Sequence, residues 1–216
     1  MSSPPAREAP TEKKACKPKE RQRTDVQEKR VAFCAAVTGV APERFVFLDE
    51  MGVHLAMTPA RGRAPFGQRA VCHVPGSRGS NISVIAAVRE DAVLTWQARD
   101  GAIDGERFLL FLRERLVPTL RAGDVVVMDN VRFHHIPEVT AVIEGANASV
   151  LFLPPYHPEF NAIEEAFSVV KGAVRRLEPR SIYDLVAALK AAFARLTQPT
   201  LRALVAHALS HTIQPS

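Results

Sequence analysis

Residues 123–135 read GDVVVMDNVRFHH, and this stretch decides which fold class the chain belongs to. Four consecutive apolar residues at 125–128 are typical of a short strand that is buried on both faces. The run stops on a carboxylate, Asp129, with Asn130 directly behind it. In α/β sheets ligands bind near the ends of such strands, so Asp129 is either a turn former or part of a binding site.

The stretches before this strand predict further strands. An apolar run at 45–48 ends on Asp49, Met51-Gly52 indicates a turn, and the alternating residues of 53–57 predict the second arm of a β-hairpin. Two more strand-like runs, NISVIAAVRE and AVLTWQA, occupy residues 81–90 and 92–98. Consecutive antiparallel strands are therefore expected in the first half of the chain.

Helical periodicity dominates the rest of the chain. DGERFLLFLRERLVPTL at 104–120 predicts an amphipathic helix capped by Asp104, and further helices are predicted from Pro137 and Asn161 and through the last third. A short strand, SVLFL, is predicted from Ser149. Antiparallel strands followed by strand–helix alternation predict an α/β fold with a mixed sheet and helices on both faces.

The bulk composition fits one soluble domain. The 216 residues are 47% hydrophobic, which is enough for a sizeable core, and no run of about 18 uncharged apolar residues is present. No signal peptide is apparent, so a cytoplasmic location without membrane attachment is expected. The three cysteines are scattered and predict neither disulfides nor a zinc cage.

The net charge of +5 is concentrated at the N-terminus, where residues 1–30 hold nine Lys/Arg against five acidic residues. Such a segment is typical either of a solvated disordered leader or of a basic arm that contacts nucleic acid. Residues 1–30 are predicted to be a disordered basic tail or linker, and residues 31–44 a short linking helix.

Three acids at strand and helix ends are candidates for one site: Asp49, Asp129 and Glu164. Packed together without a cation they would repel each other, whereas Mg²⁺ binds one or two carboxylates together with waters and phosphate oxygens. Each acid also has a purely structural explanation. Asp49 and Asp129 fit turn formers, and Asn161 with Glu164 fits a capping box.

The predicted helix from Asn161 has two distinct stripes. Ile163, Phe167, Val170, Val174 and Leu177 form an apolar stripe that predicts core packing. Glu164, Ser168, Lys171 and Arg175 lie along the adjacent stripe. This second stripe fits a track for a phosphate backbone and equally fits a solvated charged face.

FVFLDEMG, VVVMDNVRFHH and LFLPPYHPEFNAIEEAFSVVK together resemble the DDE catalytic domain of insertion-sequence transposases in the mariner-like superfamily, a DDE superfamily endonuclease. The third motif resembles the signature LPPYSPxLNPIE of that family, and the 34 residues between Asp129 and Glu164 match its spacing. The resemblance covers roughly residues 20–200 and also includes GRAPFGQ and DGAIDGERF.

The resemblance implies a ribonuclease-H-like fold: a mixed five-stranded sheet with its first three strands antiparallel, helices on both faces and a helical C-terminal region. It implies a catalytic domain over residues 45–196 and a C-terminal helix over residues 197–216. It also implies metal-dependent cleavage of DNA at transposon ends and transfer of the cut strand, carried out with two Mg²⁺ ions that Mn²⁺ can replace.

By the same resemblance, particular residues acquire roles. Asp49, Asp129 and Glu164 are the expected catalytic metal ligands, and Asn130, His134 and Asn161 are expected to support them or to lie beside the phosphate. The residues expected to contact DNA are Arg61, Arg63, Lys171, Arg175 and Arg176. The implied partners are transposon-end and target DNA, a fused or separate helix-turn-helix half, and a second copy of the chain in a dimer on DNA; the implied location is the nucleoid of a bacterial cytoplasm.

The sequence departs from the family pattern in two ways. His157, Phe160 and Ala162 stand where relatives usually have Ser, Leu and Pro, and the missing proline is expected to loosen the helix start. The first 50 residues are also too short and too polar for the paired helix-turn-helix modules of relatives. KERQRTDVQEKRVAF instead resembles the linker that follows those modules.

Two other functions stay open at the level of the sequence. One is a truncated, non-catalytic remnant of a transposase, or a regulator that binds DNA or transposase without cutting. The other is a zinc hydrolase that uses its histidines, which is disfavoured because the chain lacks HExxH or a similar ligand spacing.

Overall fold

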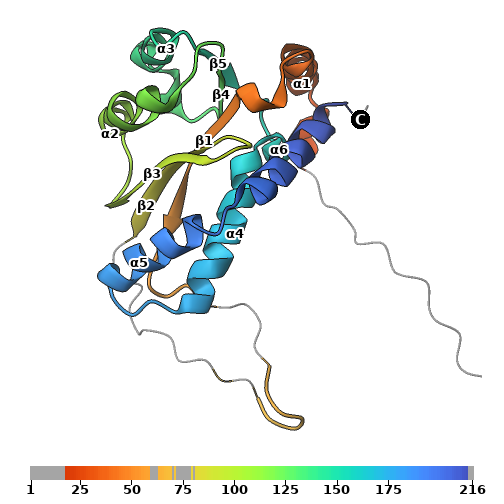
Figure 1. Ribbon diagram of the computed structural model, residues 1–216. Helices are drawn as coiled ribbons and strands as arrows, with labels where there is room; N and C mark the ends of the chain where they lie inside the picture. The colour runs from red at the N-terminus through yellow and green to blue at the C-terminus, as the bar shows by residue number, and fades with distance from the viewer. Residues whose placement is uncertain (1–17, 59–62, 70, 72–78, 80, 214–216) are drawn as a thin grey trace, which may run out of the picture.

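A computed structural model of the chain describes residues 18–58, 63–69, 71, 79 and 81–213. Its centre is a five-stranded sheet in the order β3-β2-β1-β4-β5 (Figure 1). The strands are β1 (Phe45–Val53), β2 (Ile82–Val88), β3 (Val93–Asp100), β4 (Val125–Met128) and β5 (Ser149–Phe152). The first three pair antiparallel, and β4 lies parallel to both β1 and β5. The predicted mixed sheet with three antiparallel strands is confirmed.

Helices cover both faces of this sheet (Figure 1). One face packs against α1 (Thr24–Val37), α4 (Ala162–Leu177), α5 (Ile182–Phe193) and α6 (Gln198–Ile213). The other packs against α2 (Gly105–Phe111), its continuation over Leu112–Leu116, and α3 (Pro137–Glu144). The side chain of Asp104 accepts a hydrogen bond from the Arg107 N–H, as expected of the cap of α2.

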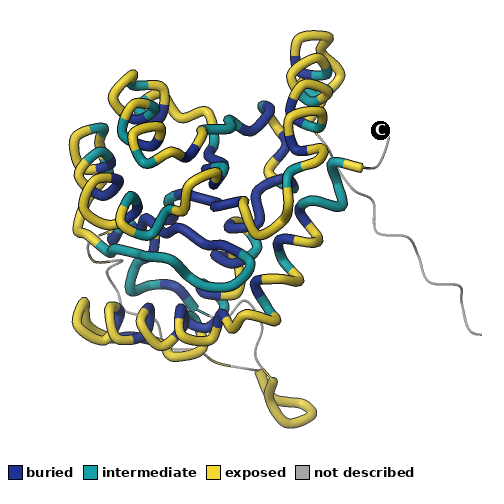
Figure 2. Tube along the Cα trace, turned by 45° about the horizontal axis from the view of Figure 1, so that its top comes forward, coloured by how far each residue is buried: buried dark blue, intermediate teal, exposed yellow. Residues whose placement is uncertain are grey.

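The alternation of side chains along β1 separates the two layers. Phe45 and Phe47 pack into the core under α4, whereas Val46 and Leu48 pack into the core under α2 and α3. Figure 2 shows the result, with buried strands at the centre and helices that expose only their outer sides. Because every second residue of a strand points to the same face, Asp49 continues the α4 face and Glu50 the opposite one.

The prediction of a β-hairpin with its turn at Met51-Gly52 was wrong. The strand β1 runs straight through this position, and Gly52 is paired with Ser83 of β2. The antiparallel ladder with β2 satisfies the backbone here, so no turn is needed. The glycine leaves room for a neighbour instead, because a Cβ on Gly52 would lie 3.2 Å from Oδ1 of Asn81.

The helix before the sheet lies earlier than predicted. It was expected over residues 31–44, with disorder up to residue 30, but α1 begins at Thr24 and ends at Val37. Its buried residues are Val26, Phe33 and Val37, whereas Val31, the expected start of its apolar stripe, is 62% exposed. The spacing from Val26 to Phe33 to Val37 is helical, so the polar residues between them belong to the outer face.

Two further predictions concern helices α4 and α6. Leu177, expected in the core stripe of α4, is 55% exposed at the end of that helix. The helix expected over residues 197–216 is α6, and its last three expected positions lie outside the described residues. Within the part of the chain that is described, no helix has the combination of length and apolar character needed to cross a bilayer.

Candidate active site

The pairing of β1 with β4 places Asp49 and Asp129 side by side. Phe47 is paired with Val127 across these parallel strands, and each aspartate comes two residues after its member of that pair. A step of two along a strand returns to the same face, so both carboxylates project from the α4 face. The strand β4 ends at Met128 while β1 continues to Val53, so a crevice opens beside β1.

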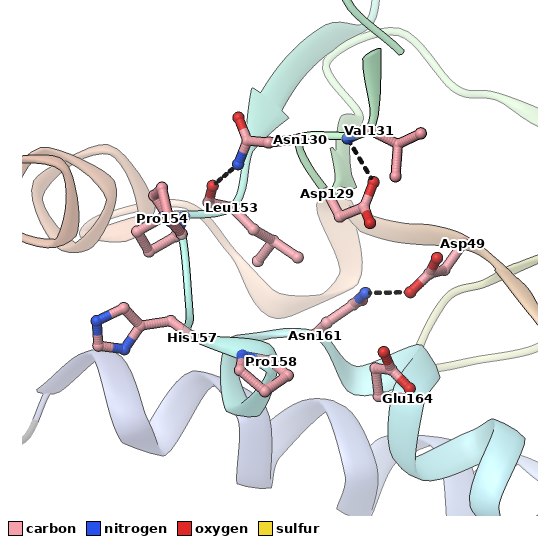
Figure 3. Close-up of a pocket in the computed structure, with 11 residues that line it drawn as sticks. Asp49, Asp129, Asn130, Val131, Leu153, Pro154, His157, Pro158, Asn161 and Glu164 are labelled. Carbon is pink, nitrogen blue, oxygen red and sulfur yellow. Dashed lines mark hydrogen bonds between the residues drawn. The ribbon is translucent and has the colours of Figure 1, made fainter. Parts of the chain in front are cut away.

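The first turn of α4 brings Glu164 to the same crevice. Asp49, Asp129 and Glu164 all line one cavity of about 340 Å³. Figure 3 shows the three carboxylates around a common space, with the side chain of Asn161 directed at Asp49. Three acids that are far apart in the sequence therefore line the same cavity.

Asp49 is the buried carboxylate of the group. Its Oδ1 accepts a hydrogen bond of 2.7 Å from the Glu50 N–H, and its Oδ2 accepts one of 2.9 Å from Nδ2 of Asn161. Burial raises the pKa of Asp49 to about 8, and the negative charges of Asp129, Glu50 and Glu164 add to the rise. A cation in the cavity would reverse this effect, because it favours the ionised carboxylate.

Asp129 is held by a buried histidine. Nδ1 of His134 lies 2.8 Å from Oδ1 of Asp129, and the Val131 N–H donates to the same oxygen. Burial alone would raise the pKa of Asp129, but the hydrogen bonds from His134 and the Val131 N–H, together with the charges of His134 and His135, outweigh it and the pKa is lowered. One oxygen of Asp129 is thus fixed from behind, which leaves the other, Oδ2, to face the cavity.

His134 also contacts Glu50, a residue that the sequence-based reasoning missed. Nε2 of His134 lies 3.2 Å from Oε1 of Glu50. Burial lowers the pKa of His134, yet its bonds with Asp129 and Glu50 prevail and raise it to about 9. The imidazolium therefore bridges two carboxylates at neutral pH. The alternation along β1 already placed Glu50 on the face opposite Asp49, but nothing in the sequence indicated its partner.

Asn161 does not act as the predicted side-chain cap. It stands at the N-cap position of α4, but its side chain makes no capping hydrogen bond there. Its amide is buried and donates to Asp49 instead, which leaves Oδ1 buried without a partner in the described residues. The capping-box interpretation of Asn161 and Glu164 is therefore wrong, because the side chain of Asn161 is used to orient Asp49.

Asn130 joins the two strand ends beside the cavity. Its Nδ2 donates to the Leu153 carbonyl just beyond β5, and both residues line the cavity. Figure 3 shows its side chain directed at Leu153 and away from the three carboxylates. Asn130 thus holds the loop after β4 against the loop after β5.

The donor set of the cavity suits a hard divalent cation. Carboxylate oxygens are the ligands that Mg²⁺ and Mn²⁺ prefer, and the unpartnered Oδ1 of Asn161 is a further oxygen at the same place. Among the described residues, no three His, Cys, Asp or Glu side chains lie close enough together to hold a metal ion by themselves. Mg²⁺ usually keeps several waters and takes few protein ligands, so an open set of carboxylates fits it better than a closed cage.

The basic residues expected to contact DNA are only partly placed. Lys171 and Arg175 are half-buried on α4, while Arg176 and Arg63 are exposed. Arg61 lies outside the described residues. Their roles stay predictions.

A family model described as DDE superfamily endonuclease matches residues 44–186. The chain is also similar to solved structures of Mos1 transposase. The match to the Mos1 transposase paired-end complex with left transposon end covers 96% of this chain and 66% of the other chain. Its TM-score is 0.78 at 16% identity. For the catalytic domain of Mos1 mariner transposase, the match covers 88% of this chain and 92% of that one, with a TM-score of 0.64 at 13% identity.

A third such structure, the mariner Mos1 paired-end complex with Mg, matches with a TM-score of 0.73 at 16% identity, over 95% of this chain and 65% of that one. These TM-scores establish a shared fold, and the ribonuclease-H-like sheet expected from the sequence is confirmed. The chain spans about two thirds of the length of the Mos1 chains in the paired-end complexes. No curated protein matches the sequence.

Proposed function

The chain belongs to the DDE superfamily endonucleases, and we propose from that membership that it is the catalytic domain of a transposase. Residues 45–196 would carry the metal-dependent cleavage of DNA at transposon ends and the transfer of the cut strand. The observation that carries this proposal is the meeting of Asp49, Asp129 and Glu164 in one cavity beside β1.

Asp49, Asp129 and Glu164 would hold the metal ions, with Mn²⁺ able to replace Mg²⁺. When bound, such ions activate water as a nucleophile and stabilise the oxygen that leaves the phosphorus. The protein residues supply orientation. Asn161 fixes Oδ2 of Asp49 from one side, and His134 fixes Oδ1 of Asp129 from behind.

The buried His134 also balances charge. Its imidazolium offsets part of the negative charge of Asp129 and Glu50, so the acids can stay ionised next to a DNA phosphate. Asn130 keeps the two loops that border the cavity at a constant separation. These contacts hold the ligands in place before any substrate arrives, which is how a preorganised site lowers a reaction barrier.

The substrate would be double-stranded DNA at transposon ends and at a target site. Lys171, Arg175 and Arg176 follow Glu164 along α4 and would contact phosphates, together with Arg61 and Arg63. Recognition of the ends would come from a helix-turn-helix half, either fused or on a separate chain, and the active assembly would be a dimer on DNA. This activity would place the protein at the nucleoid of a bacterial cytoplasm.

The test is cleavage of transposon-end DNA by the chain in Mg²⁺ or Mn²⁺, with and without a helix-turn-helix product from the same element. We expect nicking at the transposon end that requires the metal. Asp129→Asn should lower the cleavage rate by at least about a thousandfold, because it removes a ligand charge while the size of the side chain stays the same.

Asp184→Asn is the matched control. Asp184 lies in the first turn of α5, away from the cavity, so its replacement should leave cleavage unchanged. Cleavage that persists in Asp129→Asn would exclude the proposed mechanism. DNA binding without any metal-dependent cleavage would favour the regulator instead.

A further inference from the structure

The segment before the sheet packs against the loop that leads into α4. The short helix Lys19–Gln22 and α1 precede β1, and residues 154–160 lie between β5 and α4. Arg21 connects them across more than 130 residues of sequence. Its Nε donates to the Tyr156 carbonyl at 2.8 Å, and its Nη2 contacts Nδ1 of His157 at 2.8 Å and the carboxylate of Glu159.

This arginine is itself held in place. Its side chain is only 11% exposed, and its own carbonyl accepts a hydrogen bond of 2.5 Å from Nε2 of Gln27 on α1. A guanidinium that contacts a carbonyl, an imidazole and a carboxylate at once has little freedom to move. Arg21 therefore fixes the loop from Tyr156 to Glu159 relative to the N-terminal segment.

A column of three aromatic rings makes the second connection. The ring of Phe33 on α1 stacks on Phe160 with centroids 5.3 Å apart and planes 4° from parallel. Phe160 stacks in turn on His157, at 5.2 Å and 8°. The guanidinium carbon of Arg30 lies 5.9 Å from the centroid of Phe160. Two residues that depart from the family pattern thus take part: Phe160 packs on α1, and His157 packs on Phe160.

The loop needs external support. Tyr156 adopts φ 63°, a left-handed conformation that is unfavourable for a non-glycine residue. The carbonyl of this same residue is the one that Arg21 binds. The loop ends directly at the site, since Asn161 follows Phe160 and holds Asp49, and Glu164 comes three residues later.

We propose that Arg21 and Phe33 are positioning residues, and that the segment 19–37 clamps the loop 154–160 and thereby places Asn161 and Glu164 in the cavity. When these contacts are lost, the loop moves and Asp49 loses its hydrogen bond from Asn161. The first turn of α4, which carries Glu164, is then no longer held in place. The consequence for cleavage rests on the proposed function, whereas the clamp itself does not.

The structural test is amide hydrogen exchange in the metal-free protein. The amides of Phe160 and Asn161 donate to His157 and Pro158 inside the loop, so they report its opening. We expect both to exchange at least about tenfold faster in Arg21→Ala, since the loop then loses a charged hydrogen bond. Arg44→Ala is the matched control, because Arg44 also donates to a carbonyl, that of Ala122, away from the loop.

The aromatic column has its own matched pair. Phe33→Leu should also raise exchange at Phe160 and Asn161, whereas Phe193→Leu should not. Phe193 is as buried as Phe33 and stacks on Trp96, at 4.8 Å, on a different part of the sheet. Glu159→Gln, which keeps the size of the side chain, serves as a second variant for the ion pair.

The functional test separates positioning from simple loss of stability. In Arg21→Ala the Mn²⁺ concentration for half-maximal cleavage should rise about threefold or more, and kcat should fall while KM for DNA stays constant. Arg21→Lys should restore part of the effect, since an ammonium can pair with Glu159 without matching the forked contacts of Arg21. A variant that only destabilises the protein would show a normal metal requirement at low temperature.

Equal loop exchange in Arg21→Ala and Arg44→Ala would overturn the clamp. Faster exchange with an unchanged metal requirement would overturn the positioning role. If the wild-type chain fails to cleave DNA, the proposed function fails instead, and the clamp is still decided by exchange and by calorimetric titration of Mn²⁺ into the two variants.

Discussion

At the scale of single residues, the site consists of acids whose protonation depends on their neighbours. Asp49 on β1 and Asp129 just after β4 occupy equivalent positions, yet burial raises the pKa of Asp49 to about 8. The pKa of Asp129 is lowered, because its hydrogen bonds from His134 and Val131 and the nearby histidine charges together outweigh its burial. Among the described residues, the groups that donate hydrogen bonds to Asp49 are neutral amides, whereas Asp129 contacts an imidazolium. The metal-free site is consequently destabilised mainly at Asp49.

Asp49→Asn should therefore make the metal-free protein more stable. The raised pKa means that Asp49 must take up a proton on folding at neutral pH, and the amide removes this cost. A flipped Asn161 then offers the new amide the oxygen that now lacks a partner. We expect the free energy of unfolding in EDTA to rise by roughly 2 kcal/mol in denaturant titration. A lower stability of this variant in EDTA would show that the Asp49 carboxylate is a structural residue.

A second residue-scale prediction concerns the ion pair of Arg89 and Asp124, which lies outside the site. Both side chains are at most 1% exposed, and together they tie the residue after β2 to the residue before β4. Arg89→Ala should destabilise the protein by about 3–5 kcal/mol in denaturant titration, because it leaves a buried carboxylate without its counter-charge.

The exposed pair of Arg121 with Asp91 is the comparison for this ion pair. Arg121→Ala should cost no more than about 1 kcal/mol, because solvent screens its charge. Equal effects of the two substitutions would contradict the importance of burial.

At the scale of elements, the placement of the site follows from strand ends. The strand β4 stops where β1 continues, and α4 starts from the loop that closes this side of the cavity. The N-terminal segment adds a contact to that loop through Arg21, His157 and Glu159. Because this contact contains titratable groups, its strength should depend on pH.

The contact should weaken in acid. Burial lowers the pKa of His157, and the charges of Arg21 and Arg30 lower it further. Burial opposes ionisation of Glu159, but hydrogen bonds from its own N–H, His157 and Arg21 keep its pKa below the usual value of 4.5. Both groups bind fewer protons in the folded chain than in the unfolded one, so the stability they contribute is present above about pH 6.5 and is lost as pH falls.

We accordingly expect the rate of limited proteolysis within residues 19–37 to increase as the pH is lowered from 7 to 4.5. The pKa of Asp49 shifts in the opposite direction, upward. A measurement of global unfolding would mix the two effects, so the pH dependence must be measured locally, at residues 19–37. His157→Asn combined with Glu159→Gln should remove most of the pH dependence. Cleavage that is equally slow at both pH values would contradict the assignment.

At the scale of the whole molecule, the sheet separates two hydrophobic cores, one on each face. The cavity lies where the antiparallel part of the sheet meets the parallel part, at β1 and β4. A metal ion bound there would join β1, β4 and α4. A metal ion that binds the folded state and not the unfolded state stabilises the folded state by mass action.

Saturating Mn²⁺ should thus raise the melting temperature in calorimetry. At a metal concentration about 100 times Kd the gain is about 2.7 kcal/mol, or roughly 5–10 °C for a chain of this size. Asp129→Asn should abolish the shift, and Glu138→Gln, which changes an exposed acid on α3, should preserve it. An equal shift in both variants would place the bound metal elsewhere.

Much of the fold could be read locally. The strands at 125–128 and 149–152, the cap at Asp104 and the core stripe of α4 up to Val174 depend on periodicities that a few neighbouring residues display. The prediction of a hairpin at Met51-Gly52 failed because a turn-like dipeptide is overruled when β2 supplies a partner for each residue from Phe47 to Val53 of β1. The start of α1 was misplaced because only the packing against the sheet reveals that Val26 is buried and Val31 is exposed.

The sequence by itself determined the α/β class, the family resemblance and the three acids, because hydrophobic period, strand ends and motif spacing are properties of short stretches. Only the tertiary structure decided that Asn161 orients Asp49 instead of capping α4, that His134 joins Glu50 to Asp129, and that Arg21 holds the loop before the site. Most of these contacts join residues far apart in the chain. Their partners are chosen by sheet register and by burial, which depend on the whole fold and leave no local pattern.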